Sequence, residues 1–182
     1  MARLTVPGRL LFLFMALLVG QVSTLSAESA GGVRWTAPAG WKNTGSTQMR
    51  AATYAVPAAP GDTQPAECVV YFFGAGQGGP VDLNIQRWQE QFTDPSGRPA
   101  AGRVSHPTIN GMKATTLDAS GNYSGLGGPM GNGRAVPGYR VLAAIIEGPG
   151  GNIFVKFTGP QATVAAQQGA FAQMLGTFKA EK

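Results

Sequence analysis

The sequence predicts a single α+β domain, in which a central antiparallel sheet of about six strands is flanked by two helices. Two observations carry this prediction. Residues 139–160 read as two apolar strands around a glycine-rich turn, and residues 161–178 follow as an amphipathic helix. The same order, strands and then a helix, occurs once before, between residues 49 and 92. Runs of strands that are interrupted by only two helices are typical of an α+β domain.

Turn residues divide the N-terminal part into strands. The residues PAG separate Val33–Thr36 from the region around Trp41, which predicts a short hairpin. Residues 49–56 are a further strand candidate. Residues 67–73 are apolar on both faces after Glu67, which predicts a strand in the middle of the sheet.

The first helix is predicted over residues 81–92, where apolar side chains recur at helical spacing. These side chains are Val81, Ile85, Trp88 and Phe92. After a loop, residues 103–109 and 112–118 predict two strands around Asn110-Gly111, a pair that suits a type I′ hairpin because both positions need positive φ. Residues 121–138 contain seven glycines. We expect this loop to be mobile or held by a partner, because its ordering costs much entropy.

The closing block predicts the most buried part of the sheet. Residues 141–146 are apolar on both faces, as expected of a mid-sheet strand. Along the next strand, Ile153, Val155 and Phe157 face one way. The other face receives Phe154, Lys156 and Thr158. The last helix has Gly169 inside it, and a close approach of helix to sheet would explain this glycine.

The first 27 residues are predicted to be a signal peptide, which leaves residues 28–182 as the domain. Arg3 and Arg9 give a basic start, and Leu10–Gly20 is an apolar run of eleven residues. This run is shorter than the ~20 residues that span a membrane, so a signal peptide is preferred and an uncleaved anchor is the alternative. We therefore expect export to the periplasm or the cell exterior, with no stable membrane span after processing. The cleavage position stays open.

The charge of the chain argues against nucleic-acid binding. The chain has 14 Lys and Arg against nine Asp and Glu, a formal net charge of +5. Two of the basic residues lie in the predicted signal peptide, so 12 against nine remain, a net charge of +3. The remaining basic residues are scattered, whereas nucleic-acid binding needs a concentrated basic face.

Residues 74–79 match the pattern G-x-G-x-x-G between a predicted strand and a predicted helix, as in dinucleotide-binding proteins. We reject this interpretation because Pro80 interrupts the junction and no second parallel strand follows. The acidic residues that come next also do not lie at a strand tip, where they could hold a ribose. A structural loop is preferred, with an anion site of backbone N–H groups as the alternative. No cofactor is predicted.

Neither a metal site nor a catalytic residue is predicted. His106 is the only histidine, and a zinc site needs several converging ligands. Cys68 lies in an apolar strand, where a thiol behaves as a small core residue. The alternative function is a hydrolase that uses His106 with Asp118, Asp82 or Glu147. It requires the imidazole within hydrogen-bond reach of a carboxylate, in a pocket that also holds a nucleophile.

Five segments carry a resemblance to a known family. They are TAPAGW (36–41), MRAATY (49–54), GGPVDLNIQRWQEQF (78–92), PGYRVLAAIIEGPGGNIFVKFTGP (137–160) and FAQMLGTF (171–178). On these segments the chain resembles bacterial exported proteins of unassigned function with a PsbP/Mog-like fold, and the likeness extends over nearly all of residues 33–178. The resemblance implies an α-β-α sandwich, with helices on both faces of an antiparallel sheet. Relatives of this fold include a photosystem II extrinsic subunit and a Ran-binding protein, which are binding or accessory proteins.

The sequence thus predicts an exported, non-catalytic binding or accessory module for an unknown protein or small molecule. Binding residues are usually found on loops that a rigid scaffold positions. We therefore place the contact surface in and beside the two glycine loops. The candidate residues are Gly76, Gly78, Tyr123, Arg134 and Tyr139.

Overall fold

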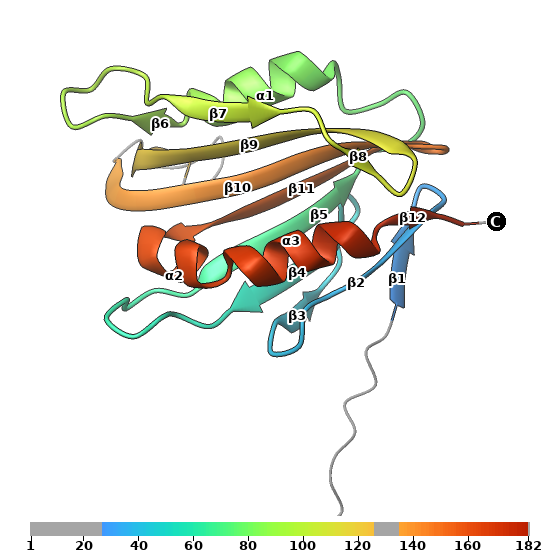
Figure 1. Ribbon diagram of the computed structural model, residues 1–182, viewed down its shortest axis with the longest axis horizontal. Helices are drawn as coiled ribbons and strands as arrows, with labels where there is room; N and C mark the ends of the chain where they lie inside the picture. Colours follow the sequence, from blue (N-terminus) through green and yellow to red (C-terminus); the bar gives the residue numbers. More distant parts are fainter. Residues whose placement is uncertain (1–26, 126–134, 182) are drawn as a thin grey trace, which may run out of the picture.

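The computed structural model describes residues 27–125 and 135–181 (Figure 1). Arg134 and half of the second glycine loop (126–134) therefore lie outside the described residues, as does the predicted signal peptide up to Ser26. The described part is an α+β domain with one large sheet, one small sheet and three helices. The large sheet has nine strands, more than the six expected, because short polar segments add edge strands that carry no apolar pattern.

All neighbouring strands of the large sheet are antiparallel. In sheet order they are β3 (Lys42–Gly45), β4 (Arg50–Val56), β5 (Ala66–Phe72), β11 (Gly151–Pro160), β10 (Val136–Gly148), β9 (Met112–Tyr123) and β6 (Phe92–Thr93). Two more strands, β7 (Gly102–Ser105) and β8 (Thr108–Ile109), also pair with β9. The small sheet has the order β1 (Ala27–Ala30), β2 (Val33–Thr36) and β12 (Lys179–Ala180).

Helices pack on both faces of the large sheet, as the family resemblance implies. Helix α1 (Val81–Gln89) lies beside β7 at one end of the sheet, and α2 (Gln161–Ala166) and α3 (Gln168–Thr177) cross in front of it (Figure 1). Strand β11 contributes to both cores, with Ile153, Val155 and Phe157 on the side of α2 and α3 and Phe154 on the side of α1. Within the described residues, no helix is both long enough and apolar enough to span a membrane.

Two turns match their predictions. Asn110 and Gly111 both have positive φ, +46° and +86°, and they join a hairpin in which Ile109 pairs with Met112. Strands β10 and β11 pair along their whole length from Tyr139–Pro160 to Gly148–Gly151. The local sequence favours the Asn110-Gly111 turn in particular, because asparagine and glycine adopt the positive φ that both of its positions need.

Four local predictions are wrong. Val33–Thr36 does not form a hairpin with the region around Trp41; it pairs with β1 and β12 instead. Phe92 is buried but belongs to β6 and not to the first helix. The last helix is divided at Gln167, whose side chain accepts a hydrogen bond from the indole of Trp41 at 3.1 Å. A Cβ at Gly169 would contact nothing within 4 Å, so close packing does not explain this glycine.

The first and last described segments close the same core, a feature we call the terminal clasp. Strand β12 pairs with β2, and the rings of Trp35 and Phe178 stack at 5.3 Å with an interplanar angle of 9°. The backbone N–H of Thr36 donates to the hydroxyl of Thr177 at 2.9 Å. Asn110 donates from its amide to the carbonyl oxygens of Gly176 and Phe178, at 2.8 and 2.7 Å. The clasp therefore joins both ends of the domain to the hairpin that precedes β9.

Candidate functional site

Helix α1 has a cavity along each of its sides. Its buried residues Ile85 and Trp88 pack toward the sheet, and Trp88 meets the edge of Phe154 at 6.4 Å. The amide of Asn84 donates to the carbonyl oxygens of Gly78 and Pro80, both at 2.8 Å, and so fixes the chain as it enters the helix. The first cavity, of about 740 Å³, lies between α1 and strands β4, β5 and β11; we call it the Lys156 cleft. The second, of about 430 Å³, lies toward β7.

The walls of the Lys156 cleft combine aromatic rings with a few charged side chains. The aromatic residues are Tyr71, Phe73, Trp88, Tyr123, Tyr139 and Phe154. The charged residues are Arg50, Glu67, Arg87 and Lys156. Cavities of roughly 300–1,000 Å³ with mostly apolar walls and a few converging polar groups are typical of small-molecule sites.

Lys156 is the central polar group of the cleft. Its ammonium group donates to Oε1 of Gln91 at 2.6 Å and to the hydroxyl of Tyr123 at 3.1 Å. It also lies 5.2 Å from the centre of the Tyr123 ring. Burial lowers the pKa of Lys156 to about 8, although nearby Glu67 opposes this shift. Among the described residues, no carboxylate lies within ion-pair distance of this ammonium group.

Tyr123 and Tyr139 form one aromatic wall of the cleft. Their rings stack at 5.6 Å with an interplanar angle of 12°, and the ring of Tyr123 also stacks on Phe92 at 4.8 Å. Tyr123 is buried and Tyr139 is half-buried. Burial raises the pKa of Tyr123 to about 12, so its hydroxyl stays protonated at neutral pH. The structure thus brings together two of the residues that we selected beside the second glycine loop.

The opposite wall comes from β4 and β5. Tyr71 stacks on Phe73 at 5.9 Å, and the guanidinium group of Arg50 lies 5.7 Å from the centre of the Tyr71 ring. Arg50 also forms an ion pair with Glu67 at 3.3 Å. Because Glu67 is paired with Arg50, it does not neutralise the two remaining cations of the cleft, Arg87 and Lys156.

Thr158 lines the cleft two residues beyond Lys156 on the same face of β11. Its hydroxyl oxygen is buried, and it has no hydrogen-bond partner among the described residues. A buried hydroxyl without a partner costs free energy, and native proteins contain few such groups. Thr158 is therefore a second polar group that a ligand could satisfy.

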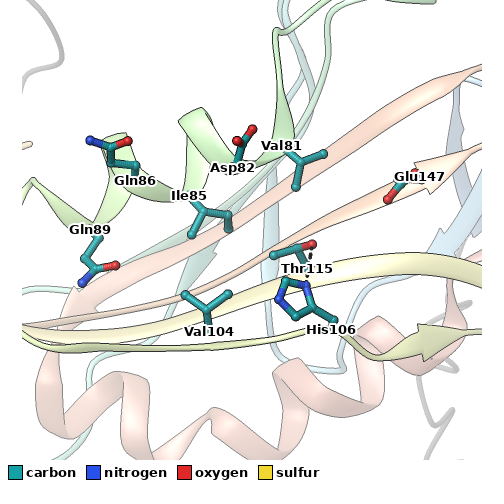
Figure 2. A pocket seen from close by; sticks show the side chains of 9 residues that line it. All are labelled: Val81, Asp82, Ile85, Gln86, Gln89, Val104, His106, Thr115 and Glu147. Carbon is teal, nitrogen blue, oxygen red and sulfur yellow. Dashed lines mark hydrogen bonds between the residues drawn. The ribbon is translucent and has the colours of Figure 1, made fainter.

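The second cavity tests the hydrolase alternative. It is lined by His106, Asp82 and Glu147, and Nδ1 of His106 lies 3.3 Å from Oγ1 of Thr115 (Figure 2). His106 is exposed, and no hydrogen bond or ion pair joins it to a carboxylate in the described part of the chain. Figure 2 shows the carboxylate of Asp82 pointing away from the imidazole. The contact that the hydrolase alternative requires is therefore missing here.

Asp118, the third carboxylate considered for His106, is held elsewhere. It accepts hydrogen bonds from Arg140 at 2.8 and 2.9 Å and from Arg103 at 3.2 Å. The hydrogen bonds from Arg140, more than any other cause, lower the pKa of Asp118. Arg140 also donates to Gln168 of α3, which places this cluster on the side of α2 and α3, away from α1. Asp118 is thus a structural carboxylate in this arrangement.

The first glycine loop contributes backbone conformations that favour glycine, and its glycines do not line a cavity. Gly76 and Gly78 have φ values of +69° and +90°, and neither lines either cavity. A Cβ at Gly78 would lie 2.7 Å from the ring of Phe154, so only glycine fits there. The loop packs against the wall of the cleft at Phe154. Arg134, the remaining candidate, belongs to the second glycine loop and lies outside the described residues.

Sequence reasoning did not select Lys156, Arg87 or Thr158. One signal for Lys156 was available, because a single lysine interrupts the apolar strand IFVKF on a face that otherwise carries Phe154. Arg87 had no such signal, since its place in the cleft depends on how α1 packs over the sheet. No group of three or more possible metal ligands is found among the described residues.

The fold and the cleft define an α+β protein with one large antiparallel sheet, helices on both faces and a ligand-sized aromatic cavity beside α1. Its structure is similar to that of cyanobacterial PsbP (CyanoP) from Synechocystis sp. PCC 6803, with a TM-score of 0.51 and 12% sequence identity over 88% of this chain and 96% of the other. PA94, a Pseudomonas aeruginosa protein of unknown function, matches with a TM-score of 0.49 and 16% identity over 86% of this chain and 97% of the other. The chain therefore has a PsbP-like fold.

Sequence comparison adds no assignment, because no family model and no curated protein matches the chain. At 12% identity the likeness to CyanoP is one of fold alone. A fold of this kind can carry many functions, so function has to be argued from the site.

Proposed function

We propose that this protein is an exported, non-catalytic binding module and that the Lys156 cleft is its ligand site. One observation carries the proposal. A largely buried lysine, without a carboxylate partner among the described residues, projects into a cavity of about 740 Å³ with aromatic walls. Charged groups in such surroundings are costly and are usually kept for a function.

The scaffold supports binding because it holds the key groups rigidly. Lys156 and Thr158 lie on β11, which pairs with β5 on one side and β10 on the other. Tyr123 and Tyr139 come from the neighbouring strands β9 and β10. Side chains on interior strands keep one geometry, so a ligand meets a preformed site and binding costs little ordering entropy.

The non-catalytic part of the proposal rests on the surroundings of His106. Its described partner is a threonine hydroxyl, and the three carboxylates considered for it make no hydrogen bond to it. Export rests on the sequence of residues 1–27, with its basic start, apolar run and small polar stretch. Both parts need solution measurements.

Binding is tested by protein-observed NMR on full-length protein expressed in an export-competent bacterial host. Intact mass of the recovered protein reports whether residues 1–27 have been removed. A library of small polar and aromatic metabolites is then screened for shifts of backbone amide signals. We expect shifts that cluster on β5, β11 and α1 and that disappear in Lys156→Met. Lys42→Met is the matched control, because Lys42 is exposed on β3 and lines neither cavity.

Two results would contradict the proposal. One is a library hit whose shifts cluster away from the cleft and persist in Lys156→Met. The other is turnover of a library compound that is lost on changing His106 to alanine, which would establish the hydrolase alternative instead.

A further inference from the structure

We propose that the ligand of the Lys156 cleft is a small aromatic carboxylate, with its carboxylate beside Lys156 and Thr158 and its ring against Tyr71 and Tyr139. This inference rests on the proposed function and adds the chemical class of the ligand. It follows from the charge of the cleft, from its hydrogen-bond donors and from the shape of its walls.

The charge of the cleft favours an anion. Three cations and one carboxylate line it, and Glu67 is already paired with Arg50 at 3.3 Å. Arg87 donates to Oδ1 of Asn84, and neither Arg87 nor Lys156 has a carboxylate partner among the described residues. A ligand carboxylate would supply the missing negative charge beside the largely buried ammonium group of Lys156, and charge-assisted hydrogen bonds of this kind are strong.

Hydrogen-bond donors converge at the base of the cleft. The hydroxyl of Tyr123 accepts from Lys156, so its own proton can be donated to a ligand. The buried hydroxyl of Thr158 has no partner in the described part of the chain. Together with the ammonium group, these are three donors, and a carboxylate accepts several hydrogen bonds through its two oxygens.

The walls favour a flat ring over a chain or a bare inorganic ion. Tyr71 and Phe73 stack on one side, and Tyr123 and Tyr139 stack on the other. Aromatic rings gain from offset stacking on such surfaces beyond the burial of apolar area. An ion as small as phosphate would satisfy the donors but leave the rings uncovered, and the cavity of about 740 Å³ has room for a two-ring molecule.

The test compares three probes by isothermal titration of the full protein at pH 7: 2-naphthoate, the neutral 2-naphthamide and the aliphatic acid decanoate. Naphthoate is expected to bind at least about tenfold more tightly than naphthamide, because hydrogen bonds to a charged group are stronger than those to a neutral one. It is expected to bind several-fold more tightly than decanoate, because only its ring gains from stacking on the aromatic walls. Equal affinity for the amide would show that the cleft does not select for a negative charge. Tighter binding of decanoate would show that the cleft does not select for an aromatic ring. Either result overturns the inference.

Two variants locate the carboxylate. Lys156→Met is expected to weaken naphthoate at least about tenfold while leaving naphthamide unchanged, which a collapsed cleft would not do. Thr158→Val keeps the shape of the side chain and is expected to weaken naphthoate a few-fold without lowering the melting temperature, because the lost hydroxyl has no partner in the described structure. Equal losses for both probes would reject the assigned position of the carboxylate.

The failure of this inference can be told apart from failure of the proposed function. If none of the three probes binds but the metabolite screen yields a ligand that shifts cleft residues, the ligand class is wrong and the site stands. If screen hits bind only away from the cleft, both are wrong.

Discussion

Replacing Lys156 by methionine removes a charge from the cleft while keeping most of the side chain's length. The folded structure lowers the pKa of Lys156 from 10.5 to about 8 through burial, with Glu67 opposing the shift and Arg87 adding to it. Between these two pH values the unfolded chain binds more protons than the folded one, so stability rises with pH. The charged lysine therefore costs about 3 kcal/mol below pH 8, and this cost disappears toward pH 10.5.

The assay is urea unfolding of the wild type and of Lys156→Met at about pH 7 and about pH 9.5, without ligand. From these pKa values, the wild type should gain about 2 kcal/mol relative to the variant over this interval. The absolute difference at one pH is less informative, because methionine also leaves Gln91 and Tyr123 without their hydrogen bonds. Tyrosine ionisation affects both proteins and cancels in the comparison.

Lys42→Met serves as the control, because it makes the same replacement at an exposed lysine that lines neither cavity. A difference between wild type and Lys156→Met that changes by less than about 0.5 kcal/mol would refute the reasoning. Lys156 would then not carry a buried charge, and the case for an anionic ligand would lose its main support.

Three further predictions concern the rest of the fold. Gly78→Ala should destabilise by about 2–4 kcal/mol and Gly40→Ala by about 1 kcal/mol in urea unfolding, because both have positive φ but only Gly78 lacks room for a Cβ; equal losses would contradict this. Cys68 is fully buried and burial raises its thiol pKa, so it should react with a thiol reagent only after denaturant is added; fast labelling of native protein would show that β5 opens. Asp118→Asn should reduce the loss of stability as pH falls through the acidic range. Hydrogen bonds from Arg140 lower the pKa of the Asp118 carboxyl, so this carboxylate stabilises the folded state near neutral pH and loses that contribution when it is protonated. If thermal unfolding shows the same acid profile for the variant and the wild type, other groups cause the loss.

The sequence predicts those parts of the fold whose signal is local. Strands β10 and β11 are apolar on both faces and joined by a glycine turn, and α1 has an apolar stripe at helical spacing. The small sheet has no such signal. Strand β12 is two residues long and pairs with β2 from the other end of the domain, so only the completed core selects this pairing. The edge strands β6 and β7 also lie in largely polar sequence, so no local pattern predicts their pairing with β9.

Some residues of the candidate site could likewise be predicted from local sequence, and others could not. Tyr123 and Tyr139 could be selected because they flank a glycine loop, and they prove to stack on each other. The alternation of side chains along β11 assigns Lys156 to its face of the sheet. Its functional role, however, depends on which residues pack against that face. Its contact with Gln91 and its nearness to Arg87 follow from the position of α1 over the sheet, which no local pattern encodes.

The terminal clasp has a consequence for the order of events in the cell. Phe178 stacks on Trp35, and β12 completes the small sheet, so the core beneath α3 cannot close until Phe178 and β12 have been synthesised. A nascent chain lacking these residues holds Trp35 and the apolar face of β2 without their cover. In such a chain the native burial of Trp35 waits for the addition of Phe178 and β12.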